Sequence, residues 1–402
     1  MTSTAKRSSP PVVLTEYRSA EISIDAATAA ALHATGKVTV TPLRSGRWLV
    51  TASSYVGTLV VGDLRLLVRP KIPLANLFLM LETGLGDHTL RRELFDYGTA
   101  TDLVPALVTL FTRTVDHALG RGVLRSYVPQ REPLIALRGR VDVTAQMRRA
   151  GMASPVDCMY DDHVEDVWEN RVLRAALRAG LRVPGVQAVA RRRMMRHLAA
   201  LGEVSDVPVT PEMIDRITFD RLNAHYRPAL GLARLILADM TVLDGAGTTA
   251  APSFMIDMNA VFQRFVTARL RAALRGRLRV TDEQVVPLAR DRQVSMRPDL
   301  LVRRGAGPAA YVGDIKYKLS TEARGVSADY YQLLAYTTAL GLDEGILIYC
   351  RDPDAREQRT ITVRNAGTRL VLHALDLSGP ADRVDAQIRI LADTIAAGAR
   401  RA

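Results

Sequence analysis

The sequence predicts an α/β protein, α+β overall, with a β-rich N-terminal module, a helical middle region and a C-terminal α/β domain. Three observations support this fold class. Short β-branched runs dominate the first part of the chain, apolar residues at helical spacing dominate the middle, and helix-like and strand-like segments alternate in the last part. We therefore expect domains at 1–73, 74–245 and 246–402, with the last boundary in the turn-rich segment 244–249.

The first two regions differ in the period of their apolar residues. Runs of β-branched residues broken by glycine-containing turns predict strands at 38–41, 48–51, 58–61 and 64–68, the last ending before Pro70. Apolar residues three and four positions apart predict helices at 74–80, 103–119, 168–181, 186–201 and 222–243. A basic, strand-like segment at 134–143 interrupts these helices.

The C-terminal region begins with a helix predicted over 256–274, because its apolar residues form one stripe and Gly276 follows it. Strands are expected near 278–288, 294–303 and 310–317, followed by a helix at 328–340. Strands at 345–350, 359–364 and 369–374 and a helix at 381–397 complete the domain. A helix, three consecutive strands, a second helix and further strands are typical of an α/β core.

Composition favours a cytoplasmic protein with a polyanionic partner. The net charge is +12 and the pI is about 10.0, which points first to nucleic acid, although a GC-rich genome also produces arginine-rich proteins. Aromatic residues make up only 5%, which argues against a single-strand binder built on stacked bases. Two cysteines, Cys158 and Cys350, suit a reducing compartment, and we expect neither a secretory signal nor a membrane segment.

Two carboxylates and a lysine are the residues that imply a reaction. Asp299 lies at the start of one predicted strand, and Asp314 and Lys316 lie two apart on the next, so their side chains share a face. Aspartates are suitable ligands for Mg²⁺, which can promote phosphodiester hydrolysis, and the backbone carbonyl of Ile315 is a further candidate ligand. Lys316 is suited to orient the attacking water and to stabilise negative charge on the phosphorane. The alternative is an exposed ion pair on a surface strand.

The sequence Pro298-Asp299 followed by Asp314-Ile315-Lys316 resembles the signature of the PD-(D/E)xK nucleases. Gln332 and Tyr336, four apart on the next predicted helix, resemble the Q-x-x-x-Y motif that follows the signature in many members. The resemblance implies a restriction-endonuclease-like domain with Asp299, Asp314 and Lys316 as catalytic residues. It implies supporting roles for Gln332 and Tyr336, for which a polar pair on a helix surface is the alternative.

Segments upstream of the signature resemble the McrC family. Glu169-Asn170-Arg171 is similar to the "ENR" segment of McrC proteins, and further McrC-like segments occur at 68–72, 222–230 and 257–266. The resemblance extends over about 60–375. It implies an Mg²⁺-dependent endonuclease subunit, with Mn²⁺ as an alternative metal, in a prokaryotic, cytoplasmic, modification-dependent restriction system that defends against phage and other foreign DNA.

The same resemblance implies two partners, double-stranded DNA and a GTP-hydrolysing McrB-like AAA+ ring. The residues before about 245 would dock on the ring and stimulate it, with contacts from Glu169, Asn170 and Arg171. This chain lacks the G-x-x-x-x-G-K-[ST] motif, so we expect no nucleotide to bind to it. Among its arginines, we expect contacts with the DNA backbone from four: Arg264, Arg292, Arg297 and Arg303.

One position departs from the family pattern. Many members carry a glutamate in the first helix of the nuclease domain, where this sequence has Gln263. The amide keeps an oxygen ligand but loses the charge, which leaves open whether the site holds one metal or two. Two other functions therefore stay open: a catalytically weakened regulator of the AAA+ ring and a stand-alone PD-(D/E)xK nuclease. The recognised modification, the stoichiometry, the activating residues and the cut positions do not follow from the sequence.

Overall fold

The computed structural model describes residues 11–44, 46–83, 103–148, 154–183, 185–240, 254–282, 284–288, 293–320, 327–351 and 358–401. The chain forms two compact units, one of which is built from two segments that are separate in the sequence. The composite unit joins Met1–Leu103 to Thr248–Ala402, and the helical unit is Val104–Gly247. The domain limits predicted at 73 and 245 stay predictions, and the turn-rich segment 244–249 lies outside the described residues.

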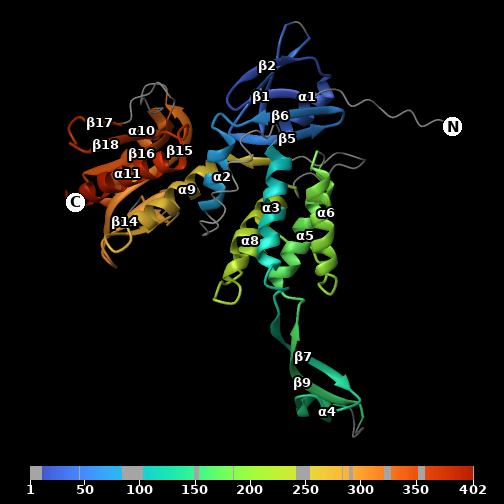
Figure 1. Cartoon of the computed structure of the whole chain (residues 1–402). Coiled ribbons are helices and arrows are strands. Elements are labelled where there is room, and N and C mark those ends of the chain that lie inside the picture. Colours follow the sequence, from blue (N-terminus) through green and yellow to red (C-terminus); the bar gives the residue numbers. More distant parts are fainter. Residues whose placement is uncertain are drawn as a thin grey trace, which may run out of the picture. The chain divides into compact units, whose positions relative to one another are not determined.

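The first and last parts of the composite unit share a four-stranded sheet of order β1-β6-β5-β10 (Figure 1). β1 (Val12–Thr15) is parallel to β6 (Leu64–Arg69), whereas β5 (Tyr55–Val61) is antiparallel to both β6 and β10 (Phe254–Asp257). The prediction of a helix from 256 was therefore wrong at its first residues. Phe254, Met255 and Ile256 pair with β5, and the helix begins after Asp257, whose carboxylate accepts a hydrogen bond from Asn259 N at 2.9 Å.

A second sheet of three strands and one helix complete the N-terminal part. The sheet has the order β2-β4-β3, with β2 at Ser19–Ile22, β3 at Val38–Pro42 and β4 at Trp48–Ala52. The helix α1 (Ala26–Ala34) was missed by the sequence prediction of strands and turns. Its signal is local, because Asp25 caps an alanine-rich segment and its Oδ1 accepts a hydrogen bond from Thr28 N at 2.6 Å.

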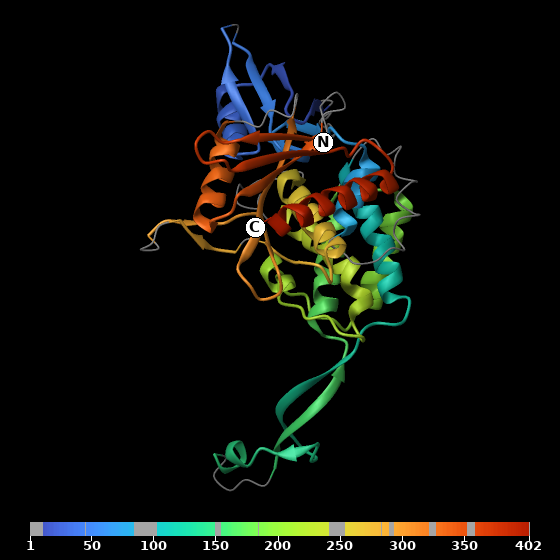
Figure 2. The ribbon, with the colours of Figure 1, turned by 90° about the vertical axis from the view of Figure 1, so that its left-hand side faces the viewer.

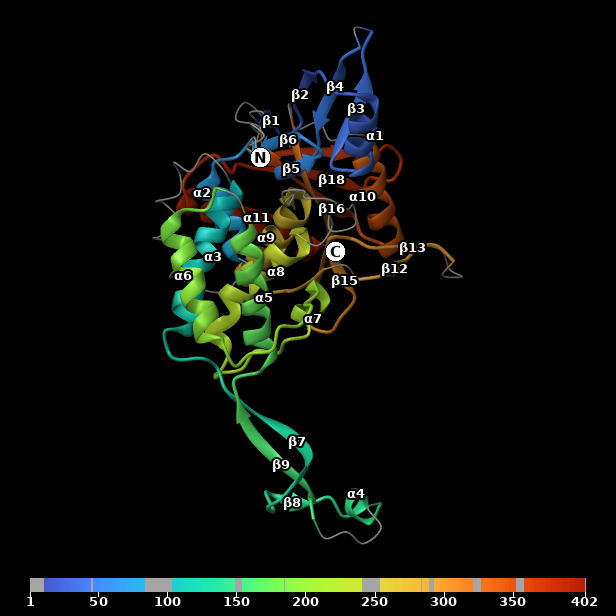
Figure 3. The ribbon, with the colours of Figure 1, turned by 90° about the vertical axis from the view of Figure 1, so that its right-hand side faces the viewer.

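The C-terminal part is built on a six-stranded mixed sheet of order β11-β14-β15-β16-β18-β17 (Figure 2). Its strands are β11 (Arg279–Thr281), β14 (Leu300–Arg303), β15 (Ala309–Ser320), β16 (Glu344–Arg351), β17 (Gln358–Thr362) and β18 (Arg369–Leu375). Antiparallel β14 and β15 confirm the predicted hairpin, but the strand predicted over 294–303 is divided, because only 300–303 pairs with β15 and 295–296 pairs elsewhere. A small separate hairpin, β12 (Val286–Pro287) with β13 (Ser295–Met296), extends to one side (Figure 3).

Helices cover both faces of this sheet. Successive residues of β15 point to opposite faces, so each set of side chains contacts a different helix. Val312 packs with Leu333 and Tyr336 of α10 (Ser327–Leu340) in a buried apolar cluster. On the other face, Tyr317 contacts Phe262 of α9 (Met258–Ala273), with 5.6 Å between ring centroids. Two further helices belong to this unit: α2 (Leu74–Thr83) and α11 (Ala381–Arg401).

A buried polar cluster joins the N-terminal sheet to β15. Glu16, 2% exposed, follows β1, and its Oε2 accepts hydrogen bonds from Lys71 N at 2.8 Å and from Tyr317 Oη at 3.1 Å. The Lys71 ammonium lies 3.9 Å from the centre of the Tyr317 ring. Burial raises the pKa of Glu16 to about 7, although the backbone N–H and the charge of Lys71 oppose the shift.

This shift predicts a stability that falls as pH rises. A raised folded-state pKa gives stability that is complete below the ordinary value, 4.5, and is lost as pH passes through about 7. Glu16→Gln should remove about 1–3 kcal/mol of the pH dependence of the free energy of unfolding between pH 5 and 8. Urea unfolding at several pH values, with Glu21→Gln as a surface control, measures it. An unchanged pH slope in Glu16→Gln would contradict the prediction.

The helical unit consists of packed helices from which a long β-hairpin extends (Figures 1 and 3). Its helices are α3 (Leu103–Leu119), α5 (Trp168–Arg182), α6 (Ala188–Ala200), α7 (Pro211–Asp215), the 3₁₀ helix η3 (Ala224–Tyr226) and α8 (Arg227–Met240). The hairpin contains β7 (Ser126–Leu134), β8 (Arg140–Val141), α4 (Val143–Met147) and β9 (Val156–Val164). The insert predicted at 134–143 covers only part of this hairpin. Its partner strand β9 was not predicted, because apolar and polar residues do not alternate regularly along it.

Candidate active site

Antiparallel pairing of β14 and β15 brings the two predicted carboxylates together. Leu300 pairs with Gly313, so Asp299, the residue before β14, lies opposite Asp314 and on the same face of the sheet. Asp299 Oδ2 accepts a hydrogen bond from Ile315 N at 2.9 Å, which fixes its side chain against β15. The local reason for this geometry is the hairpin turn at 304–308, in which Gly305 adopts a positive φ of 59°.

The charge state of Asp299 is strongly perturbed. Burial and then the negative charge of Asp314 raise the pKa of Asp299 to about 7, against the lowering effects of the Ile315 N–H and Lys316. Two carboxylates that face each other in a partly buried site repel one another unless a proton or a cation lies between them. A cation bound between the two carboxylates would remove this repulsion.

Asp314 and Lys316 form an ion pair. Asp314 is 1% exposed, and its Oδ2 lies 2.8 Å from Lys316 Nζ. Among the described residues, neither Asp314 oxygen accepts a hydrogen bond of regular geometry, despite this short distance. Burial lowers the pKa of Lys316, but the carboxylates of Asp314 and Asp299 outweigh it, so this pKa lies above its ordinary value. Lys316 is therefore charged at neutral pH.

The donor set fits one hard cation. A buried carboxylate oxygen without a partner is costly, and coordination to Mg²⁺ would satisfy Asp314 Oδ1, the oxygen that does not face Lys316 Nζ. In the described part of the chain, no three His, Cys, Asp or Glu side chains gather as a metal site. Asp299 and Asp314 would thus bind the ion with water and substrate oxygens, which is the way Mg²⁺ is usually held. The role of the Ile315 carbonyl stays a prediction.

Gln263 of α9 lies at this site and acts as a hydrogen-bond donor. Its Nε2 donates to Asp299 Oδ1 at 3.0 Å. The amide therefore supports one of the two carboxylates, a contact that a glutamate could not make when ionised.

Gln263→Glu should lower the stability of the metal-free protein and make its melting temperature depend more strongly on Mg²⁺. A third carboxylate removes the donor to Asp299 and adds repulsion, so we expect the metal-free protein to lose about 1–2 kcal/mol. The additional charge should also lower the Mg²⁺ concentration at which the melting temperature rises half-maximally. Thermal melts across a Mg²⁺ series measure both effects. Gln263→Met is the control, since it loses the donor without adding charge, and an equal Mg²⁺ midpoint in wild type and Gln263→Glu refutes the prediction.

The helix α10 contributes the two other predicted supporting residues. Gln332 Nε2 donates to Tyr336 Oη at 2.7 Å, and Tyr336 Oη donates to the carbonyl of Arg297 at 3.4 Å. Burial and then the charge of Asp314 raise the pKa of Tyr336, which shows that its hydroxyl is near the acidic pair. These contacts hold the segment that leads to Asp299.

Sequence reasoning missed a second polar group beside the site. Lys318 Nζ lies 3.2 Å from both carboxylate oxygens of Asp329, and Tyr349 Oη donates to Asp329 Oδ2 at 2.8 Å. Lys318 follows Lys316 at a spacing of two residues, and this spacing of the two lysines is a signal that could have found it.

The four arginines predicted to contact DNA lie in different settings. Arg264 and Arg297 are exposed, whereas Arg303 is half-buried and donates to the Gly307 carbonyl at 3.0 Å and to Gln284 Oε1 at 3.2 Å. Arg292 lies outside the described residues. Contact with DNA stays a prediction for all four.

The Glu169-Asn170-Arg171 segment opens α5 and makes contacts inside the helical unit. Asn170 is fully buried, and its Nδ2 donates to the carbonyls of Leu124 at 2.8 Å and Glu165 at 2.7 Å. The Asn170 side chain therefore holds the start of α5 to these two carbonyls, and its predicted partner contact stays a prediction. Glu169 and Arg171 are half-buried, and their predicted partner contacts stay predictions.

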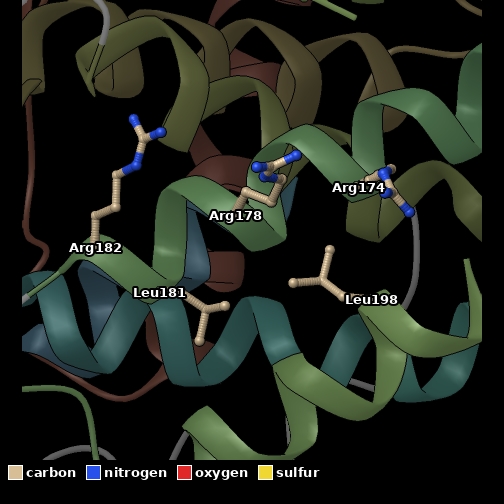
Figure 4. A pocket seen from close by; sticks show the side chains of 5 residues that line it. All are labelled: Arg174, Arg178, Leu181, Arg182 and Leu198. Atoms are coloured by element: carbon tan, nitrogen blue, oxygen red, sulfur yellow. The ribbon is translucent and has the colours of Figure 1, made fainter. Parts of the chain in front are cut away.

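A hollow in the helical unit offers a different chemistry. It measures about 420 Å³ and is lined by Arg174, Arg178 and Arg182 of α5, with Leu181 and Leu198 (Figure 4). The three arginines recur every fourth residue along one side of the helix. Arg178 pairs with Asp206, and an Arg174 N–H donates to the Leu201 carbonyl. Because no carboxylate pair lines it, this hollow is no rival for the metal-binding chemistry.

The fold and the site together define a mixed α/β protein with a two-carboxylate, one-lysine centre. Comparison with protein families identifies the chain plainly: residues 50–350 match the model of the McrBC 5-methylcytosine restriction system component, and the chain belongs to this family. This confirms the family predicted from the sequence. No curated protein matches the chain.

Two solved structures resemble the fold. A chain of the refined half-complex from a tetradecameric assembly of Thermococcus gammatolerans McrB AAA+ hexamers with bound McrC is 19% identical, with a TM-score of 0.62. The match covers 96% of this chain and 100% of that one. A chain of the cryo-EM structure of the T. gammatolerans McrBC complex is 20% identical, covering 66% of this chain and 88% of that one, with a TM-score of 0.47. In the described residues, no helix is long and apolar enough to cross a membrane.

Proposed function

We propose that this protein is the Mg²⁺-dependent DNA endonuclease subunit of a McrBC-type restriction system, with a PD-(D/E)xK centre at Asp299, Asp314 and Lys316. The observation that carries the proposal is the convergence of Asp299 and Asp314 beside the charged Lys316. Family membership supports a role in restriction, and the net charge of +12 supports a polyanionic substrate.

The site residues have separate roles in this proposal. Asp299 and Asp314 would hold the metal, which would supply a Lewis acid for the phosphoryl group and lower the pKa of a bound water. Because the pKa of Lys316 is raised, its ammonium keeps its charge, orients the water by a hydrogen bond and stabilises the negative charge that develops on the phosphorane. Gln263 fixes Asp299 through Nε2, and Tyr336 fixes the backbone that leads to it.

We also propose that a McrB-like AAA+ ring binds the helical unit. Its hairpin exposes large apolar side chains, including Ile135 at 91%, Leu137 at 61% and Met147 at 77%. Exposed apolar residues of this kind on one projecting element are typical of a protein-interaction surface. The similarity to a chain from an assembly that contains McrB AAA+ hexamers supports the same partner.

Cleavage of methylated duplex DNA tests the proposal. The protein is combined with a McrB-like AAA+ protein, GTP and Mg²⁺, and products are resolved on a gel. We expect cuts that require all three and that EDTA abolishes. Complete absence of cleavage in the active complex refutes the proposal.

A regulator without nuclease activity is the second candidate, and Gln263 is the observation that favours it. In that case the chain would raise GTP hydrolysis by the ring while DNA stays intact. Cleavage without partner or nucleotide would instead indicate a stand-alone nuclease.

A further inference from the structure

The strand that carries the catalytic centre is interrupted directly after it. β15 pairs with β16 through Lys316 and again through Leu319, and the pairing skips Tyr317 and Lys318 between them. Bulges of this kind occur beside active sites, where they redirect a side chain or release a backbone group.

A hydrogen bond from the N-terminal part of the composite unit holds the backbone of the bulge. Tyr17 Oη donates to the Tyr317 carbonyl at 2.8 Å, a carbonyl that lies in the unpaired segment. Tyr17 itself has a φ of 58°, which is uncommon outside glycine and marks a constrained position. The bulge is therefore a defined conformation with a dedicated hydrogen-bond donor.

The second residue of the bulge, Lys318, forms an ion pair with Asp329 of α10. Asp329 is buried, and both of its oxygens lie 3.2 Å from Lys318 Nζ, while Tyr349 Oη binds Oδ2. The Lys318 side chain is 44% exposed. An ammonium has three donors, so one N–H that is not directed at Asp329 remains for a ligand on the solvent side.

We propose that Lys318 forms a second phosphate site, which binds the DNA phosphodiester next to the one that is cut. Lys318 is two residues from Lys316. Tyr349 is the β16 partner of Lys316, and its hydroxyl binds the Asp329 that pairs with Lys318, so the two lysines lie on the same side of the sheet. Asp329 and Tyr349 hold its ammonium at this position, and Tyr17 holds the backbone of the bulge. The site deepens the proposed nuclease function and rests on it.

The competing role of Lys318 is to fasten α10 to β15 through its ion pair with Asp329. In that role Lys318 would affect only the stability of the fold. Asp329 lies in the first turn of α10, where the helix dipole also favours its negative charge. A phosphate contact has a separate signature, because each neutralised phosphate releases counterions and adds to the salt dependence of DNA binding.

The test compares the complete complex containing wild type or Lys318→Met, with Ca²⁺ replacing Mg²⁺ so that duplex DNA is bound without being cut. We expect binding to weaken about 3- to 10-fold and the slope of log affinity against log salt to become shallower by about one. Lys318→Arg should restore most of the slope. Arg364→Met, which removes an exposed cation in the turn between β17 and β18, is the matched control and should keep the wild-type slope.

Two readouts separate the possible failures. In Mg²⁺, Lys318→Met should raise the KM for DNA while kcat at saturating DNA stays within about twofold of wild type. A lower melting temperature with an unchanged salt slope shows that Lys318 only fastens α10, which overturns the phosphate site. If wild type itself neither binds nor cuts DNA in the complex, the proposed nuclease function fails first.

Discussion

Asp314→Asn is expected to abolish DNA cleavage while the protein stays folded. The substitution removes one of the two carboxylates that face each other at the site and the ion-pair partner of Lys316. Loss of the metal's contribution, several kcal/mol, corresponds to a fall in rate of about 10³-fold or more, since each 1.36 kcal/mol is tenfold. Cleavage by the complete complex in Mg²⁺ is the measurement.

The same variant should also lose its stabilisation by metal. A ligand that binds only the folded state stabilises it by about 2.7 kcal/mol at 100 times its Kd, so Mg²⁺ should raise the melting temperature of wild type but not of Asp314→Asn. In EDTA the variant should stay folded, because the repulsion with Asp299 that it removes offsets part of the lost ion pair with Lys316. Asp343→Asn, an exposed aspartate of the same domain, serves as control. Wild-type cleavage by Asp314→Asn would falsify the site.

Gly57→Ala is expected to destabilise the composite unit by about 3 kcal/mol. Gly57 has a φ of 133°, and a Cβ there would lie 2.1 Å from the Phe254 carbonyl oxygen, on backbone that cannot move without breaking the pairing of β5 with β10. The expected result is loss of the sheet that joins residues before 103 to those after 248. Denaturant unfolding measures the stability, and hydrogen exchange at β5 and β10 locates the opening.

Gly62→Ala is the matched control for this prediction. Gly62 also has a positive φ, 59°, but among the described residues no atom lies within 4 Å of the place that a Cβ would occupy, so only the backbone preference is lost. That loss costs about 1 kcal/mol. Equal destabilisation by the two substitutions would mean that the contact with β10 adds nothing.

Much of the C-terminal fold follows from local patterns. The two-residue period of 310–317 and the helical spacing of 328–340 each bury a face, and the observed β15 and α10 include those residues. The helix predicted from 256 was wrong at its start, because the strand β10 depends on β5, about 200 residues away in the chain. The hairpin of β7 and β9 was predicted only in part, as an insert at 134–143, because its strands bury little apolar surface and so lack a regular apolar period.

For the candidate site, too, some features were predictable from the sequence and others were not. By itself the sequence predicted that Asp299, Asp314 and Lys316 lie on one face of two neighbouring strands, because their spacing requires only a hairpin. Only the tertiary structure decided what surrounds them: the Gln263 donor, the buried Asp329 behind Lys318 and the Tyr17 hydroxyl on the bulge. Strand and helix periods arise from neighbours in the chain, whereas these contacts join distant segments through the complementarity of their surfaces, which leaves no local pattern.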